Sequence, residues 1–370
     1  MLRQLGPRAL NRTYLERQFL LRRSPATSLE AVGHLVCLQG QESNSPYLSL
    51  WSRLARFAHG DLTTLLQDRL VVRSKLHRNT QHLILADDFR TVRPLLEPVL
   101  KRARQGAFGR AIAGLDLADL AGAGRELMSG QGVTRPQLGR RLCERFPGRD
   151  RQALTYAVQS LVAHVHPPPS GTWGDRTATP LVLAEEWIGG PLEAEPRIED
   201  VVVRYLAAHG PASVMDVQAW SGLTRLRPVL DGMRARLRTY RDTSGRELFD
   251  LPDAPIAEPD GPAPVRFLPA FDNLILSHAD RTRVIADEDR QRVITGSEVR
   301  PVFLVDGFVR GIWSLRADGG VQVTPYRPLT SREADETRQE AELLLDFLAE
   351  PVTGRVVEGA AEPRPPVVIE

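Results

Sequence analysis

Two glutamines separated by one glycine, Gln39-Gly40-Gln41, are the residues of this sequence whose types and spacing best suit a chemical role. A carboxamide both donates and accepts hydrogen bonds, so two of them can hold one water molecule. Glutamine cannot act as a true general base, because its amide does not titrate usefully. The pair therefore suits a reaction that needs little acid–base help. Hydrolysis of the N-glycosidic bond to an already cationic purine is such a reaction, since polar groups can position water and stabilise an oxocarbenium-like sugar.

The same pair also has a purely structural interpretation. Both glutamines lie where a helix is expected to end, and their amides can bond the free carbonyls of its last turn. Gly40 between them removes side-chain bulk, so that backbone or a substrate can approach closely. From the residues alone, both interpretations stay open.

Three helices and a β-hairpin are expected around this segment. Asn11 is predicted to cap the first helix, a capping box at 27–30 to open the second, and Ser45-Pro46 to begin the third. The stretch 69–88 alternates and is rich in Val, Leu and Ile, which predicts a hairpin. This order is typical of a winged helix-turn-helix, whose recognition helix faces DNA.

The same predicted order of helices followed by a hairpin or wing recurs twice along the chain. A capping box at 134–137 and another at 213–216 each precede a further helix, and Ser244-Gly245 is a predicted hairpin turn. After a linker come apolar runs with an Asp306-Gly307 turn, which predict a small β-barrel or curled sheet, and then an acidic helix whose Leu343, Leu344 and Phe347 pack on it. The predicted fold is α+β, with three tandem winged helix-turn-helix units arranged around a C-terminal β-barrel. The predicted boundaries are 1–110, 111–195 and 196–255 for the three units, 264–350 for the barrel with its hairpin and helix, and 351–370 for a tail.

Composition narrows the class of protein further. No GxGxxG follows a strand, and there is no Walker loop, no GxSxG elbow and no His/Cys spacing that fits zinc. Cys37 and Cys143 supply neither a disulfide framework nor a thiolate cluster. We therefore expect no cofactor and no metal. No apolar run reaches the length of a membrane span and no signal peptide is evident, which favours a cytoplasmic protein without a membrane partner.

Charge is distributed unevenly. The net charge is only +2, but residues 1–110 hold 18 Lys+Arg against 8 Asp+Glu, while the other 260 residues hold 30 against 38. A basic first third is what a polyanionic partner requires. A merely solvated basic face explains the same count, so charge alone decides neither way.

Five motifs then occur in order along the chain: VCLQGQESNSPYLSLWSRL, RNTQHLILADD, TWGDRTATPLVLAEEWIG, FLPAFDNLILSHADRTRVI and LVDGFVRGIWSL. Together they resemble the winged-helix DNA glycosylases of the AlkZ/YcaQ type, from about residue 8 to about residue 348. The resemblance implies a monofunctional enzyme without lyase activity, which excises N7-alkylated purines, including bulky adducts and interstrand crosslinks. The family's catalytic motif maps onto Gln39 and Gln41. Gln at the second place is similar to the AlkZ branch, whose members often protect antibiotic producers, and the small Gly40 implies a slightly roomier site.

The resemblance also implies a partner, double-stranded DNA bearing an alkylated purine, bound by a monomer. A hairpin after Phe271 would probe the groove, or else form an ordinary barrel edge. His82 is either a core or surface histidine or a phosphate contact, and the arginines after the third helix either bind phosphates or solvate that helix. Trp173 and Trp187 are interpreted as packing anchors. The predicted DNA-binding residues are Asn44, Arg53, Arg56, Arg78, His82, Asp272, His278, Arg281 and Arg283.

Two rival functions remain at this stage. A transcription regulator would use three winged helices and a basic face without catalysis, although regulators usually dimerise to read palindromes. A resistance protein that sequesters an alkylating compound would bind the free drug without DNA.

Overall fold

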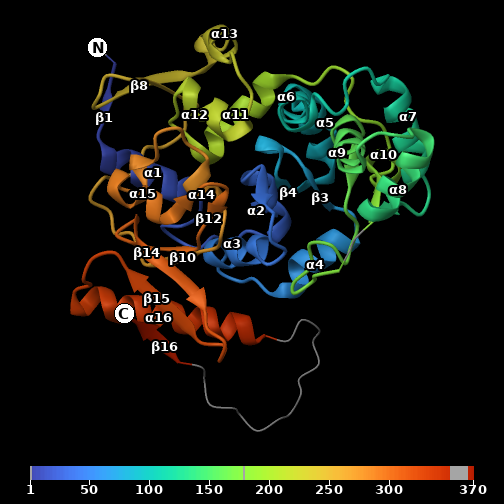
Figure 1. Ribbon diagram of the computed structural model, residues 1–370. Coiled ribbons are helices and arrows are strands. Elements are labelled where there is room, and N and C mark those ends of the chain that lie inside the picture. Colours follow the sequence, from blue (N-terminus) through green and yellow to red (C-terminus); the bar gives the residue numbers. More distant parts are fainter. Residues whose placement is uncertain (1, 178–179, 351–365) are drawn as a thin grey trace.

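The first part of the chain folds around a three-stranded sheet, of which two strands, β3 and β4, are labelled in Figure 1; the third strand ends at Gln39. This computed structural model describes residues 2–177, 180–350 and 366–370. The elements are helices α1 (Pro7–Arg17), α2 (Ser28–His34), α3 (Ser45–Arg53) and α4 (His59–Gln67), strands β2 (Cys37–Gln39), β3 (Val71–Lys75) and β4 (Gln81–Leu85), and the 3-10 turn η1 (His77–Asn79). The strand order is β2-β4-β3, and both pairs are antiparallel.

Local signals in this part are partly confirmed. The capping box at Thr27 opens α2, and β3 and β4 form the predicted hairpin. Asn11 does not cap a helix, because α1 already begins at Pro7; its buried amide donates instead to the carbonyls of Arg283 and Gly307, both at 2.8 Å. The N-cap of α3 is Asn44, one residue before the predicted Ser45.

The next two parts contain further helices and strands, including two helices within residues 86–108 that the sequence did not predict. The second contains α5 (Ala86–Leu95), α6 (Glu97–Phe108), α7 (Leu117–Met128), β5 (Val133–Thr134), α8 (Arg135–Arg145), α9 (Arg151–Leu161), β6 (His164–Val165), β7 (Pro180–Leu183) and α10 (Ala184–Trp187). The third contains α11 (Ile198–His209), α12 (Val214–Ser221), α13 (Arg227–Gly232), η2 (Arg234–Arg236), β8 (Arg238–Asp242) and β9 (Glu247–Asp250), with β1 (Gln4–Leu5) parallel to β8. The capping boxes at Thr134 and Ser213 and the β8–β9 hairpin are confirmed. The winged-helix assignment and the unit boundaries stay predictions.

The C-terminal part contains an open sheet. It comprises β10 (Arg266–Leu268), α14 (Asn273–Leu276), η3 (Arg281–Arg283), α15 (Asp287–Val293), β11 (Ile294–Thr295), β12 (Glu298–Val299), β13 (Val302–Val305), β14 (Phe308–Leu315), β15 (Val321–Pro325), α16 (Ser331–Ala349) and β16 (Val367–Ile369). The main sheet has the order β10-β13-β14-β15-β16, and β10 and β16 are free edges among the described residues. The predicted barrel is therefore not closed among the described residues, and 273–276 and 281–283, which lie in apolar runs expected as strands, are helical. The Asp306-Gly307 turn between β13 and β14 is confirmed.

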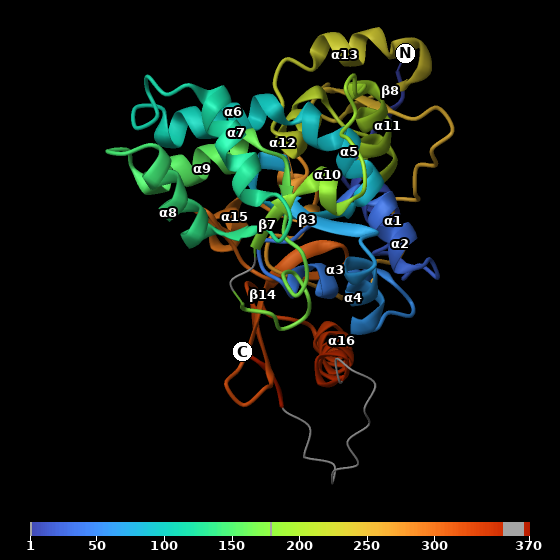
Figure 2. The ribbon, with the colours of Figure 1, turned by 90° about the vertical axis from the view of Figure 1, so that its right-hand side faces the viewer.

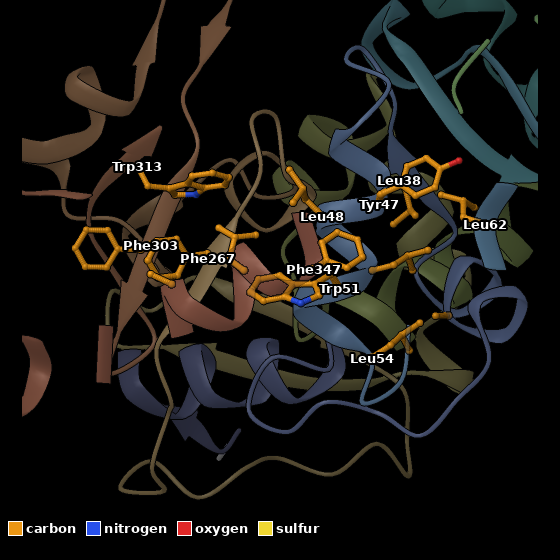
Figure 3. Packing of buried hydrophobic residues seen from close by; sticks show 14 of the residues in the cluster. Leu38, Tyr47, Leu48, Trp51, Leu54, Leu62, Phe267, Phe303, Trp313 and Phe347 are labelled. Carbon is orange, nitrogen blue, oxygen red and sulfur yellow. The ribbon is translucent and has the colours of Figure 1, made fainter. Parts of the chain in front are cut away.

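One core joins the first part to the C-terminal sheet (Figure 3). Trp51 of α3 stacks on Phe347 of α16 with ring centroids 6.0 Å apart, and Phe267 of β10 stacks on Phe303 of β13 at 5.9 Å. Leu344 and Phe347 are buried as predicted, whereas Leu343 is 49% exposed. The α3 helix is thus held against the C-terminal sheet by its apolar face.

The two views agree on how these parts lie. Helices α6 to α9 form one side of the molecule, and α16 with β14 to β16 lies away from them, with α3 and α4 between (Figures 1 and 2). In the part of the chain that the structure describes, none of the helices combines the length and the apolar composition of a bilayer span.

Candidate active site

Gln39 is the last residue of β2 and lies opposite His82 of β4 in the ladder. Its side chain is only 5% exposed. The Gln39 Oε1 accepts from the Gln41 backbone N at 3.0 Å, and its Nε2 donates to the Thr80 Oγ1 at 3.1 Å. The predicted helix-terminating role is wrong, because α2 ends at His34 and a strand follows it. The Gln39 amide keeps one N–H and one oxygen lone pair for a further partner.

Gln41 differs from Gln39 in its exposure. Its side chain is exposed, and its Oε1 lies 3.4 Å from the backbone N of Gln81. The Gly40 N donates to the Gln81 carbonyl at 2.8 Å, so that the chain stays beside β4 for one residue beyond β2. Both side chains thus belong to one short segment, in which the Gln39 carboxamide is bonded to the Gln41 backbone.

Gly40 packs against the protein interior. A Cβ added there would lie 2.7 Å from the Leu83 Cδ1 of β4, too close for an unshifted contact. The predicted roomier site is therefore wrong, since Leu83 fills the space that the missing side chain leaves.

His82 is a buried core histidine. Its ring is 0% exposed, and its Nδ1 lies 3.0 Å from the Thr80 carbonyl oxygen. Burial, followed by the charge of Arg78, lowers the pKa of His82 to about 3. The ring next to Gln39 is thus neutral near pH 7. The buried His82 ring cannot reach a phosphate, so the alternative of a phosphate contact at His82 is wrong.

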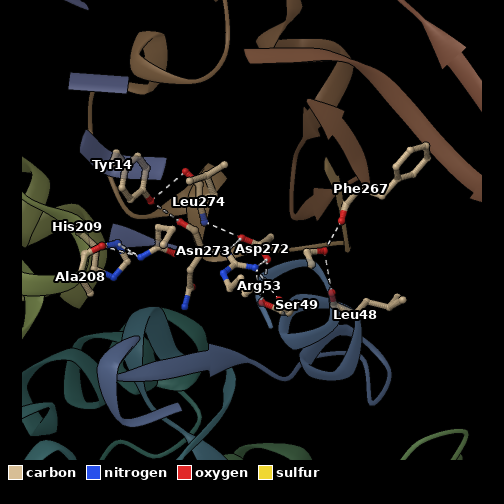
Figure 4. A network of polar contacts seen from close by, with 12 residues as sticks. Tyr14, Leu48, Ser49, Arg53, Ala208, His209, Phe267, Asp272, Asn273 and Leu274 are labelled. Carbon is tan, nitrogen blue, oxygen red and sulfur yellow. Dashed lines mark hydrogen bonds and ion pairs between the residues drawn. The ribbon is translucent and has the colours of Figure 1, made fainter. Parts of the chain in front are cut away.

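Arg53 and Asp272 form a buried polar network (Figure 4). The Arg53 Nη2 donates to the Asp272 Oδ1 at 2.7 Å and its Nη1 to the Oδ2 at 2.9 Å. The Ser49 hydroxyl also donates to Asp272, at 3.0 Å. Because both charged groups are buried against each other, neither is available to DNA, and their predicted DNA contacts are wrong.

The segment after Phe271 is not a β-hairpin. Asp272 caps the short helix α14 by accepting from the Leu274 N at 2.9 Å, and η3 follows. His278 is buried, edge-on to Tyr14 at 4.5 Å, and the buried Arg283 donates to the Pro211 carbonyl at 2.8 Å. The predicted DNA contacts of His278 and Arg283 are therefore wrong, because α1 and the Pro211 region cover these side chains.

Four predicted DNA-binding residues are at least partly exposed, and they are Asn44, Arg56, Arg78 and Arg281. Arg56 is exposed just after α3. Arg281 is partly buried, and its Nε has no hydrogen-bond partner among the described residues. Arg78 has a left-handed φ of 54° and donates to the Trp220 carbonyl at 2.8 Å, while its Nη2 has no such partner in the described chain. The Asn44 Oδ1 accepts from the Gly174 N at 2.8 Å.

Sequence reasoning missed Arg73 of β3. Its guanidinium donates to the Gly40 carbonyl from Nε at 3.0 Å and from Nη2 at 2.9 Å, and its Nη1 donates to the Ser170 Oγ at 2.7 Å. Burial lowers the pKa of Arg73, and the charge of Asp175 opposes this shift. Only the hairpin register, with Arg73 opposite Leu83 and Lys75 opposite Gln81, brings this residue to the glutamines.

The segment around Trp173, before β7, packs against the first part of the chain. Trp173 packs on Tyr47 at 5.5 Å and on His59 at 4.1 Å between ring centroids, which agrees with its interpretation as a packing anchor. Trp187 lies under Arg69, whose guanidinium carbon is 4.2 Å from the ring centroid.

Comparison with known proteins identifies the family. A model described as "DNA glycosylase AlkZ-like" matches residues 32–347, most of the chain. The chain belongs to the AlkZ-like DNA glycosylase family. A solved structure, Streptomyces sahachiroi DNA glycosylase AlkZ, is similar with a TM-score of 0.80, covering 99% of this chain and 100% of that chain at 21% identity. This likeness shows a shared mixed α+β fold. A search of curated protein sequences gave no significant match.

The protein is thus a DNA glycosylase, and DNA is its substrate. In this AlkZ-like glycosylase, the family model spans the glutamine pair, Arg73 and the α14 segment alike. Within the described chain, no three His, Cys, Asp or Glu side chains gather as metal ligands.

Proposed function

We propose that this glycosylase hydrolyses the N-glycosidic bond of N7-alkylated purines in double-stranded DNA, with Gln39 and Gln41 as its catalytic pair. The single observation that carries the proposal is the 3.0 Å hydrogen bond from the Gln41 backbone N to the Gln39 Oε1, which ties the Gln39 carboxamide to the backbone that carries Gln41. Membership of the AlkZ-like family supports the same reaction.

The chemistry fits residues that do not titrate. Alkylation at N7 gives the purine a positive charge, so the leaving base needs no acid. Gln39 has a spare N–H and a spare lone pair, and Gln41 is exposed beside it, so together they hold the attacking water. Their amide oxygens also stabilise the positive charge that develops on the deoxyribose. The neutral His82 behind Gln39 is consistent with a reaction that requires no proton donor.

DNA contacts are proposed at the residues that remain available. The basic first part attracts the phosphate backbone. Arg56 and Arg281 contact phosphates, since Arg56 is exposed and Arg281 is partly exposed. Arg78 and Asn44 lie on segments that flank the glutamine pair and complete the contact surface. The enzyme acts as a monomer, and it leaves an abasic site without cutting the strand.

A defined-lesion assay tests this proposal. A duplex with one N7-alkylguanine is incubated with excess protein, and the free base and the abasic site are measured over time. Release of the base at a rate that falls strongly in Gln39→Ala and Gln41→Ala supports it. Gln105→Ala, which removes an exposed glutamine of α6, is the matched control and should retain the wild-type rate. If both active-site variants excised the base at the wild-type rate, the glutamine pair would not be catalytic.

The substrate range and biological role extend the same proposal. Similarity of the motif to the AlkZ branch favours bulky alkylguanine adducts or interstrand crosslinks and protection against a DNA-alkylating natural product. Parallel assays on a bulky monoadduct and on a crosslinked duplex separate the two lesions. Expression of the protein in a sensitive host should increase the fraction of cells that survive exposure to the alkylating agent, and only when both glutamines are intact. Protection that persists in the double alanine variant would instead indicate sequestration of the drug.

A further inference from the structure

We propose that Arg73 is the positioning residue of the catalytic segment: its guanidinium holds the Gly40 carbonyl, and so both flanking glutamines, against the segment around Ser170. This inference rests on the proposed catalytic role of Gln39 and Gln41.

The geometry is that of a clamp. Two donors of one guanidinium converge on a single carbonyl oxygen, that of Gly40, at 3.0 and 2.9 Å. The same Nη2 lies 3.5 Å from the Gln41 carbonyl oxygen. Nη1 faces the other way and donates to the Ser170 Oγ at 2.7 Å. A guanidinium presents its donors in a fixed plane, so these bonds set the position of Gly40 relative to Ser170.

The segment needs such support because β2 is an edge strand. The sheet order β2-β4-β3 leaves one side of β2 without a strand neighbour. On that strand the Cys37 carbonyl accepts from the Asn273 Nδ2 at 2.8 Å. Past Gln39, the backbone bond from Gly40 to Gln81 continues the pairing by one residue. The Gly40 carbonyl is held by Arg73, which reaches it from β3.

Two glycines make room for this side chain and its neighbours. A Cβ on Gly171 would lie 2.9 Å from the Arg73 Cδ, and the φ of Gly171 is +82°. A Cβ on Gly40 would lie 2.7 Å from the Leu83 Cδ1, and Leu83 is the ladder partner of Arg73. The backbone of Arg73 is tied to the same segment, since its carbonyl accepts from the His166 N at 2.9 Å. Arg73 therefore couples the glutamines to the 166–174 segment.

The test compares Arg73 with an arginine that makes the same kind of contact elsewhere. Arg90 of α5 donates to the carbonyls of Ile188 and Pro191, both at 2.9 Å, and a Cβ on Gly190 would lie 2.6 Å from its Nη1. Arg90→Ala thus removes an equivalent clamp that does not touch the glutamines. The maximal single-turnover excision rate, the affinity for lesion DNA and the slope of affinity against salt are measured for Arg73→Ala, Arg73→Lys, Ser170→Ala and Arg90→Ala, well below each melting temperature.

Arg73→Ala should lower the maximal rate by about 10- to 100-fold, the scale of a misplaced reacting group, with affinity and salt slope unchanged. Lysine keeps the charge but not the planar fork, so Arg73→Lys should remain at least several-fold slow. Ser170→Ala should lose a few-fold, and Arg90→Ala should match the wild type. The proposal is overturned if Arg73→Lys excises the base at the full rate. It is also overturned if Arg73→Ala loses no more rate than Arg90→Ala does. If Arg73→Ala does not fold, the rate of Arg73→Lys alone decides.

Two further outcomes separate the possible failures. A salt slope reduced by about one in Arg73→Ala would make Arg73 a phosphate contact instead. If Gln39→Ala and Gln41→Ala are slow but Arg73→Ala is fast, the inference about Arg73 fails and the proposed function stands. If both glutamine variants keep the wild-type rate, the proposed function itself fails.

Discussion

The Arg53 guanidinium and the Asp272 carboxylate form a buried bidentate ion pair across 219 positions of sequence, at 2.7 and 2.9 Å. Arg53 is 1% exposed and Asp272 2%. The pair joins α3, which follows the glutamine segment, to the cap of α14. The position of the site thus depends on a contact between two segments that lie far apart in the sequence.

Arg53→Ala should destabilise the protein without changing its electrostatic contact with DNA. The substitution leaves the Asp272 carboxylate buried and unpaired, which typically costs about 3–5 kcal/mol. Urea unfolding measures the loss, and binding over a salt series should keep its wild-type slope. Arg56→Ala, an exposed arginine three residues on, is the control and should change stability by at most about 0.5 kcal/mol. A reduced salt slope with unchanged stability in Arg53→Ala would contradict this assignment.

The two glutamines should be equivalent in catalysis but different in stability. Each alanine variant should lose about 10²-fold in single-turnover rate, the scale of one preorganised polar contact. Gln39→Ala should also lose about 1 kcal/mol of stability, because it removes partly buried hydrogen bonds to Thr80 and to the Gln41 N. Gln41→Ala should unfold like the wild type, since its side chain is exposed.

The double variant tests whether the pair acts as one unit. Because both amides address a single water, it should be little slower than the slower single variant. Multiplied losses would show that the two glutamines act on separate steps.

Features with local signals were predictable from the sequence. The capping boxes at Thr27 and Ser213 need only residues three positions apart. The Asp306-Gly307 turn has φ values of 49° and 80°, which Asp and Gly tolerate in a two-residue hairpin. Gln39 and Gln41 were singled out by their residue types and spacing, and their catalytic role stays a proposal.

Features that depend on distant contacts were not predictable. Strand β2 has three residues, too few to show an alternating pattern, so the neighbours of Gln39 across the ladder could not be inferred. A short apolar run such as 273–276 fits strand or helix equally, and the capping bond of Asp272 decides for helix. An arginine in α3 was interpreted as a surface cation, because its partner Asp272 lies 219 positions away.

Arg281→Ala should weaken DNA binding through electrostatics alone. Its side chain is partly exposed, so its guanidinium can contact a phosphate. Loss of one phosphate contact should lower the slope of log affinity against log salt by about 0.9. Arg316→Ala is the control, since Arg316 is already paired with Asp318 at 3.0 Å. An unchanged slope in Arg281→Ala would remove Arg281 from the proposed DNA surface.

Acid should destabilise the protein steeply through its histidines. Burial lowers the pKa of all eight histidines, to about 4 for His59 and about 3 for His82 and His164. The unfolded chain therefore binds protons that the folded chain does not. Stability from these rings is complete above the unfolded pKa near 6.5 and is lost as pH falls toward the folded values. Asp250 and Glu340, whose pKa burial raises, act in the opposite sense and offset part of the loss.

Each such ring removes about 1.4 kcal/mol per pH unit in that window, so three of them consume a typical stability of about 5–15 kcal/mol within a few units. Urea unfolding between pH 7.5 and pH 4.5 measures this slope. His82→Asn, which keeps a polar group near Thr80 but cannot take up a proton, should reduce the slope by about one proton. The same His82→Asn variant should excise N7-alkylguanine with the wild-type pH dependence across neutrality, because the ring is already neutral there. Stability that stays flat from pH 7 to pH 5 would mean that these rings accept protons in the folded protein as readily as in the unfolded chain.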